Sequence, residues 1–228
     1  MRKLYFTLLA ILPLFSLSCN HNKNKTVINS GRIDYKITYI DHHLNEKNLE
    51  LMPRNMKLVF NKKQATNFIE GFMGFYKLNT YTDFHARSCS TLLKVFDKYY
   101  IFEGRKDEMM CCFDEMNDME LTETNETKVI AGFNCKKLIV RVPSFSEPIT
   151  VYYTDEIDLK HPNITNPYKM INGVLMEFEM KLLDIHMRFT AEKYQPLPDN
   201  KIENVFPKKT KEVSRVQMAR LMERLLEF

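Results

Sequence analysis

The chain has 228 residues, of which 44% are hydrophobic and 27% are charged, and its formal net charge is +4. This length suits one domain with a real core, and the ordinary composition argues against collagen-like, low-complexity, disordered and polytopic membrane proteins. The basic residues are spread along the chain and mixed with acidic ones, so the charge does not indicate a nucleic-acid partner.

The N-terminus has the pattern of an export signal. Two basic residues precede a largely apolar stretch over residues 4–17, and Ser18 and Cys19 follow directly. A stretch of this length is too short to span a bilayer comfortably but is typical of a secretory signal peptide. We therefore expect residues 1–18 to be removed. A membrane-anchoring helix that stays attached is the alternative.

Ser18 followed by Cys19 resembles the lipobox of bacterial lipoproteins, although Ser16 stands where that pattern prefers leucine. In that family the signal is cut just before the cysteine and the thiol is diacylated, so the resemblance implies a lipid anchor on Cys19. Two or three acyl chains attach a protein stably to a membrane, whereas one chain does not. We then expect residues 19–30, which are largely polar, to form a lipidated flexible tether. Ordinary cleavage, with Cys19 an incidental thiol, is the alternative.

Alternation of apolar and polar residues predicts a mainly antiparallel sheet. In residues 32–39 apolar side chains alternate strictly with polar ones, which is typical of a half-buried strand. The clearest hairpin pairs residues 174–180 with residues 185–191 around a turn near Asp184. Further strands are expected over residues 56–60, 65–72, 92–96, 99–103, 108–113, 137–142 and 149–154.

The hydrophobic period changes near the C-terminus. Met218, Leu221, Met222, Leu225 and Leu226 recur at helical spacing, which predicts an amphipathic helix over residues 211–227. Its apolar stripe could cover the apolar face of the sheet, although its basic residues would also suit an anionic membrane. The elements together predict one α+β domain, mainly antiparallel β, over residues 31–228.

Three stretches carry a family resemblance. They read KVIAGFNCKK (128–137), VYYTDEI (151–157) and INGVLMEF (171–178). In this order they resemble the DUF4412 and GLPGLI families of bacterial envelope proteins, which are similar in turn to the LolA and LolB lipoprotein carrier and receptor fold. The resemblance covers residues 31–207. It implies a strongly curved, incomplete barrel covered by helix, with an apolar concave face that can hold an acyl chain, and it supplies no catalytic residue.

The apolar faces of the first strand and of the last hairpin are the candidate ligand surface. Methionine is flexible and polarizable, and it suits surfaces that accept varied apolar partners. The alternative is that these side chains fill a closed core. The candidate face comprises Ile33, Tyr35, Ile37, Met176, Phe178, Met180, Met187 and Phe189.

Four cysteines besides Cys19 are disulfide candidates. On a strand over residues 108–113, Cys111 and Cys112 would point to opposite faces, so we expect each to take a different partner. One would pair with Cys135 and the other with Cys89. Buried free thiols are the alternative. There is no CxxC spacing, and although His85 and Cys89 are four residues apart, the sequence places no second ligand pair near them, so we expect neither a metal nor a cofactor.

The sequence contains no GxSxG, GxGxxG, phosphate-binding loop or HExxH motif, and nothing in it argues for an enzyme. The acidic residues Asp155, Glu156 and Asp158 are a weak pointer to a hydrolase. We expect a non-enzymatic envelope lipoprotein that binds an acyl chain or a lipoprotein lipid. No acidic residue follows Cys19 directly, and the resemblance to bacterial lipoproteins and their sorting patterns therefore implies the outer membrane, facing the periplasm. A protein-interaction or scaffold lipoprotein with a fully packed core is the alternative.

We expect Cys19→Ala to abolish acylation and to release or mislocalise the protein, because the predicted lipid attaches to that thiol. Metabolic labelling with a clickable fatty acid measures acylation, and fractionation of the envelope measures membrane retention. Unchanged membrane retention of the variant would refute the lipobox assignment.

Overall fold

The computed structural model describes residues 27–42, 44–199 and 206–226. The predicted signal peptide, the Cys19 anchor and most of the predicted tether lie outside these residues. The strands are β1 (Gly31–Asp41), β2 (Asn55–Phe60), β3 (Gln64–Glu70), β4 (Tyr76–Asp83), β5 (Ser88–Val95), β6 (Lys98–Glu103), β7 (Glu120–Ile130), β8 (Phe133–Arg141), β9 (Ile149–Thr154), β10 (Val174–Leu182), β11 (Ile185–Gln195) and β12 (Thr210–Glu212).

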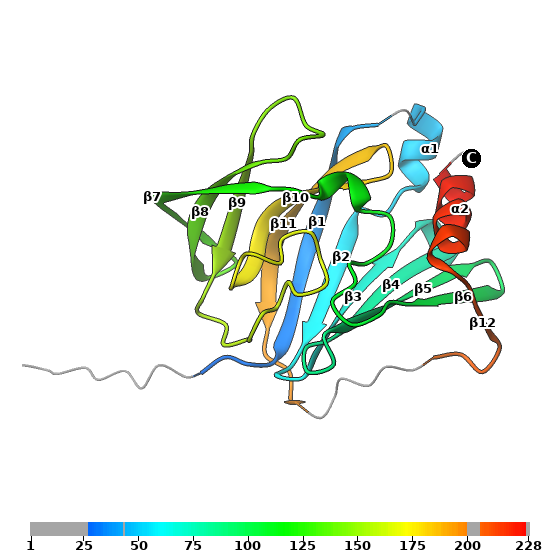
Figure 1. The fold of residues 1–228 in the computed structure, drawn as a ribbon, viewed down its shortest axis with the longest axis horizontal. Helices are drawn as coiled ribbons and strands as arrows, with labels where there is room; N and C mark the ends of the chain where they lie inside the picture. Colours follow the sequence, from blue (N-terminus) through cyan, green and yellow to red (C-terminus); the bar gives the residue numbers. More distant parts are fainter. Residues whose placement is uncertain (1–26, 43, 200–205, 227–228) are drawn as a thin grey trace, which may run out of the picture.

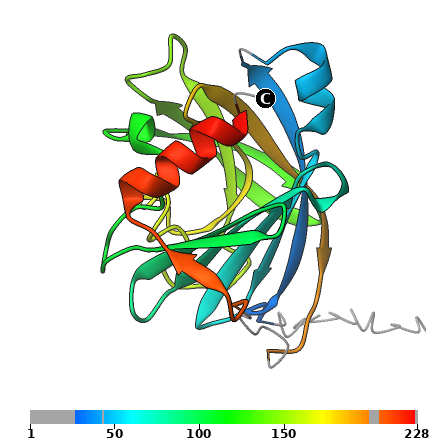
Figure 2. The same cartoon turned by 90° about the vertical axis from the view of Figure 1, so that its right-hand side faces the viewer.

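The described strands form one sheet with the order β12-β6-β5-β4-β3-β2-β1-β11-β10-β9-β8-β7 (Figure 1). Each pair of neighbours is antiparallel except β12 and β6, which run parallel. The sheet curves but does not close, because β7 and β12 are its two edges (Figure 2). The strand pairing and the curvature of the sheet confirm the prediction of a curved, barrel-like, mainly antiparallel fold.

β1 lies at the centre of the sheet and joins its two halves. It pairs with β2 on one side and with β11 on the other, so the first and last long strands of the chain are neighbours. The predicted alternation is present, since Ile33, Tyr35 and Ile37 are buried while Lys36 and Thr38 are not. The buried Tyr35 hydroxyl donates to the Leu175 carbonyl at 2.7 Å.

Two α-helices are present in the described residues. The short helix α1 (Glu46–Leu51) begins where the Asn45 side chain accepts a hydrogen bond from the Asn48 N–H. The second, α2 (Arg215–Leu226), lies across the open side of the sheet, as Figure 2 shows, and buries Met218, Met222 and Leu226. Neither helix is long and apolar enough to cross a membrane.

The predicted C-terminal helix is confirmed, but its start is wrong by four residues. Residues 210–212 form β12 and pair in parallel with residues 99–101 of β6. The Val213 N–H continues this contact by donating to the Ile101 carbonyl at 2.8 Å. An edge strand can take these backbone groups into the sheet, whereas the N–H groups in the first turn of a helix would have no partner within the helix.

The predicted strand over residues 108–113 is wrong. This segment is a loop whose backbone groups bond to partners outside the sheet. The Met110 N–H donates to the Thr165 carbonyl at 2.9 Å, and the Arg215 guanidinium donates to the carbonyls of Met109 and Met110 at 2.7 and 3.2 Å. With these groups occupied, the apolar run has no need of a neighbouring strand.

A buried carboxylate connects neighbouring strands at one end of β10 and β11. The Glu179 residue is 5% exposed, and its oxygens accept hydrogen bonds from His186 Nε2 at 2.7 Å and from Arg188 Nη2 at 2.6 Å. Burial opposes ionisation of this carboxyl, but the hydrogen bonds from His186 and Arg188 outweigh burial and lower the pKa of Glu179.

We expect Glu179→Gln to lower the free energy of unfolding by about 1–3 kcal/mol at neutral pH, because two donors would lose a charged acceptor. A carboxyl with a lowered folded pKa stabilises the protein above its unfolded pKa of about 4.3, and this stabilisation fades as the pH falls through the folded pKa. Urea unfolding at neutral and acidic pH measures both effects.

Glu177→Gln is the matched control on the same strand, because Glu177 pairs with the half-exposed Lys128 at 3.1 Å. We expect it to cost about 0.5 kcal/mol or less. A Glu179→Gln variant whose destabilisation is the same at acidic and neutral pH would contradict this account.

Candidate functional site

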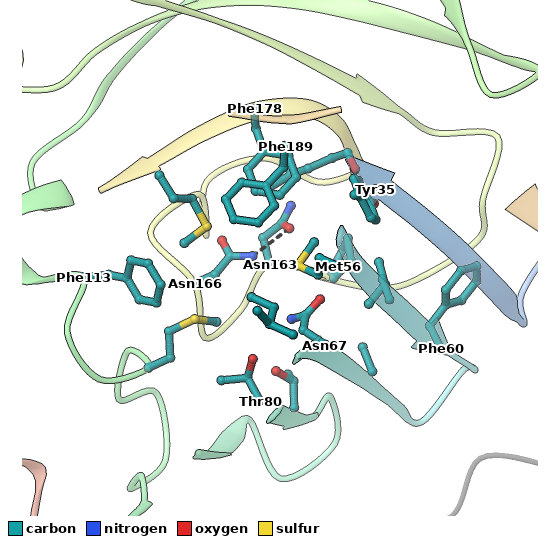
Figure 3. A pocket seen from close by; sticks show the side chains of 18 of the residues that line it. Tyr35, Met56, Phe60, Asn67, Thr80, Phe113, Asn163, Asn166, Phe178 and Phe189 are labelled. Atoms are coloured by element: carbon teal, nitrogen blue, oxygen red, sulfur yellow. Dashed lines mark hydrogen bonds between the residues drawn. The ribbon is translucent and has the colours of Figure 1, made fainter. Parts of the chain in front are cut away.

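The concave side of the sheet contains two small apolar cavities. The first has a volume of about 90 Å³, and Figure 3 shows Phe178 and Phe189 on one side of it, opposite Asn67 and Thr80. The two phenyl rings stack with their centroids 5.1 Å apart. The second cavity, of about 40 Å³, lies beside the C-terminal half of α2, where Met222 borders both cavities.

A larger groove lies between α1 and the C-terminal end of α2, and we call it the rim groove. Its volume is about 400 Å³. It is lined by Leu44, Asn48, Leu51, Met52, Phe72, Phe75, Tyr76, Val95, Phe96, Leu225 and Leu226. The second cavity shares four of these residues with the rim groove, namely Met52, Tyr76, Leu225 and Leu226, and it shares Ile69, Leu78 and Met222 with the first cavity. The three spaces therefore form one row from the rim into the interior.

None of the residues that line these three spaces is Asp, Glu, His, Lys or Arg. Burial also raises the pKa of Tyr35, Tyr39 and Tyr76, so the tyrosines at the site stay neutral. The polar groups that remain are amides, hydroxyls and the Cys111 thiol. This arrangement excludes water from an apolar ligand and offers it no charge.

Exposed aromatic side chains surround the rim groove. Phe72 and Phe75 are each 50% exposed and Phe96 is 61% exposed, and the rings of Phe75 and Phe96 meet edge to face at 5.9 Å. Isolated exposed apolar residues are ordinary, but a contiguous group of large ones marks an interaction site. The two sequence signals are the apolar run around Met73, between β3 and β4, and the phenylalanine in the turn that follows β5.

The predicted ligand face divides between cavity walls and closed core. Tyr35, Phe178, Met180 and Phe189 line the first cavity, and Ile37 and Met187 line the second. Ile33 and Met176 are fully buried and line neither cavity nor the groove. The structure thus brings six of the eight residues to the row of spaces. The rim groove itself was missed, because its residues come from loops and helix ends rather than from one alternating face.

All four described cysteines are buried and free, so neither the predicted bond to Cys135 nor the predicted bond to Cys89 is formed. Cys135 packs in the main core, whereas the adjacent pair packs beneath α2. Burial raises the pKa of both Cys89 and Cys135 to about 11, which keeps these thiols protonated.

The expected opposition of Cys111 and Cys112 is also wrong. The two residues lie in a turn rather than on a strand, and their Sγ atoms are 2.6 Å apart. The alternation that would separate them applies only to extended backbone.

The acidic patch lies apart from the cavities. Asp155 pairs with Lys136 at 2.6 Å, and Glu156 accepts a hydrogen bond from the Asn134 N–H at 3.1 Å. Both acidic residues are outside the lining of the row of spaces. In the described part of the chain, no three His, Cys, Asp or Glu residues group as a metal site would require.

The fold is similar to that of PNGF-II in two crystal forms, with TM-scores of 0.52 and 0.54 at 13% and 15% sequence identity. Each match covers 86% of this chain and 33% of PNGF-II, so the chain spans about a third of that protein. A beta-barrel-like DUF1849 protein from Brucella abortus matches at a TM-score of 0.29 and 9% identity, over 75% of this chain and 99% of that one. No protein-family model and no curated protein matches the sequence. The likeness to PNGF-II concerns the fold alone.

We expect Met222→Ala to lower the free energy of unfolding by about 2–4 kcal/mol. Met222 is 3% exposed and borders both inner cavities, so its truncation would join them into one larger cavity. Chemical denaturation measures the change. Val216→Ala on the same helix is the control, because Val216 is exposed, and we expect a change within about 0.5 kcal/mol. Equal effects of the two substitutions would show that α2 does not pack on the sheet in solution.

Proposed function

We propose that the protein is a non-enzymatic lipoprotein of the bacterial envelope that binds the acyl chain of a lipid or of another lipoprotein. The observation that carries the proposal is the uncharged row of spaces that runs from the rim groove into the sheet. The resemblance to the DUF4412 and GLPGLI families, and through them to the LolA and LolB fold, supports the same role.

The sizes of the spaces suggest how an acyl chain would bind. The rim groove, at about 400 Å³, falls within the usual range of about 300–1,000 Å³ for small-molecule sites. Each buried methylene contributes about 0.8 kcal/mol, so a few carbons in the groove already give useful affinity. The inner cavities, at about 90 and 40 Å³, are too small for the rest of a long chain.

Deeper insertion requires side chains to move, and the walls between the spaces contain suitable ones. Met52 borders the rim groove and the second cavity, and Met222 borders both inner cavities. Methionine has three rotatable bonds in its side chain and repacks readily around varied apolar partners. Rotation of these two side chains would join the spaces, so that bound chains lie partly in the groove and partly inside the sheet.

The membrane attachment belongs to the same proposal. A lipid on Cys19 would tether the domain to the outer membrane, facing the periplasm, with residues 20–30 as the spacer. The domain would then meet acyl chains at the surface where they are delivered or removed.

A scaffold module with a packed interior is the second candidate. The small volume of the inner cavities favours it, because most of the concave face is filled by its own side chains. The similarity to one third of a longer chain also suits a module that works beside another domain. In this case the exposed phenylalanines of the rim groove would contact a protein.

We expect a domain spanning residues 27–228 to bind a fluorescent long-chain fatty acid, and Phe96→Asp to weaken that binding at least about tenfold by placing a charge in the rim groove. Phe96 is exposed and has a φ of 54°, a conformation that aspartate tolerates, so the variant keeps its stability. Fluorescence titration measures affinity, and thermal unfolding checks the fold.

Met170→Asp is the control, because Met170 is 73% exposed and lies outside the groove. It should bind the fatty acid as the unaltered domain does. A domain that ignores the fatty acid and purifies without lipid, as judged by mass spectrometry, would overturn the acyl-binding proposal in favour of the scaffold. Equal losses in both variants would show that binding occurs elsewhere.

A further inference from the structure

Two adjacent thiols converge beneath α2. The Sγ atoms of Cys111 and Cys112 are 2.6 Å apart, and both residues are buried, at 2% and 5% exposure. Neighbouring side chains on regular backbone diverge, but the turn here gives Cys112 a φ of 74°. The backbone therefore holds the two sulfurs together rather than leaving them to meet by chance.

Arg215, the first residue of α2, fixes one side of this turn. Its guanidinium donates to the carbonyls of Met109 and Met110 and pairs with Asp114 at 2.7 Å. The Cys111 Sγ lies 3.6 Å from the Arg215 carbonyl oxygen. Cys111 is thus held beside the positive charge of Arg215, at the first residue of a twelve-residue helix.

The surroundings divide the two thiols into a nucleophile and a proton donor. The hydrogen bond from Cys112 lowers the pKa of Cys111 against the effect of burial, and the positive charge of Arg215 acts in the same direction. The same hydrogen bond and burial raise the pKa of Cys112. A thiol with a lowered pKa next to one that keeps its proton is the arrangement that thiol–disulfide exchange requires.

We propose that Cys111 and Cys112 are a redox couple that closes a vicinal disulfide by exchange with a disulfide-bearing oxidant. The Cys111 thiolate attacks one sulfur of the oxidant, whose S–S bond breaks and releases one half as a thiolate. Cys112 loses its proton to solvent and attacks the Cys111 sulfur, which releases the other half. The two cysteines are oxidised by two electrons, and the oxidant is reduced to two thiols.

The Cys111–Cys112 disulfide would be easily reduced and would not serve as a structural cross-link. Adjacent Cα atoms are about 3.8 Å apart, which is shorter than the usual range of about 4.4–6.8 Å in disulfides. A constrained bond of this kind is easily reduced again, as regulatory disulfides are. Its closure would act on the cavity wall, because Cys111 lines the first cavity and both residues pack in the cluster that contains Met218 and Met222 of α2.

Cys89 is the nearest competitor for this chemistry. Its own thiol contacts the Glu108 carbonyl at 3.7 Å and is protonated, so it is the poorer nucleophile. Cys135 lies in the separate main core. The inference stands on the geometry of the turn and does not depend on the proposed acyl-binding function.

The test is a peptide map of the full chain after exposure to oxidised glutathione. Trypsin cuts after Lys and Arg, so Cys111 and Cys112 fall together in peptide 107–128, whereas Cys89 and Cys135 fall in peptides 88–94 and 129–136. We expect peptide 107–128 to lose two hydrogens without joining another peptide, and to recover them after mild reduction. A link from this peptide to either of the others, or two thiols that remain open to alkylation, would overturn the proposal.

Single serine variants test the order of the steps. In Cys112→Ser the exchange should stop with glutathione attached to Cys111. In Cys111→Ser the remaining thiol should react at least about tenfold more slowly, because burial still favours the protonated form of Cys112. Cys135→Ser is the control and should oxidise as the wild type does. Equal rates in the two single variants would overturn the assignment of Cys111 as the nucleophile, and the map of the unaltered chain tests the bond without relying on any variant.

Discussion

The pairing of β1 with both β2 and β11 is the constraint on which the rest of the structure depends. The strands from β1 to β6 form one meander and those from β7 to β11 form another, and β1 is the place where the two hydrogen-bond to each other. Each meander alone would expose an apolar face and an additional edge. Their union produces a concave surface wide enough to hold a row of cavities, and Tyr35 connects the halves again through the Leu175 carbonyl.

The open side of this surface determines what α2 does. An uncovered concave face would leave the side chains around Leu93 and Phe102 in water, and the helix removes them from it with Met218 and Met222. The helix covers only part of the opening. Where it ends, beside α1, the rim groove begins, so the groove is the space at the rim of the sheet that neither helix fills. The position of the groove therefore follows from how far α2 covers the open side of the sheet.

The sequence predicts a strand or helix correctly where a single hydrophobic period runs through the segment. β1 and β11 alternate because each has one buried face, whereas β10 is buried on both faces along most of its length. α2 shows a clean helical period because it lies on one surface. β4 and β7 were not expected. β7 is an edge strand exposed over most of its length, and its Glu and Thr residues carry no apolar alternation. The loop over residues 108–113 is apolar for a different reason, since tertiary partners bury it.

The candidate site was predictable only in part, because a groove at the rim of a sheet is made by elements distant in sequence. Phe72 and Phe75 lie in a short loop, Phe96 lies in a turn and Leu225 lies at the end of α2, and no local period connects them.

The exposure of the three phenylalanines has an energetic cost. Burying a large apolar side chain stabilises a protein by about 1.5–3 kcal/mol, so a fold that leaves three phenylalanines half exposed forgoes that stability. A polar residue at these positions would give the same fold with less risk of aggregation. The exposed rings therefore do not serve the core, which is consistent with the binding role proposed for the rim groove.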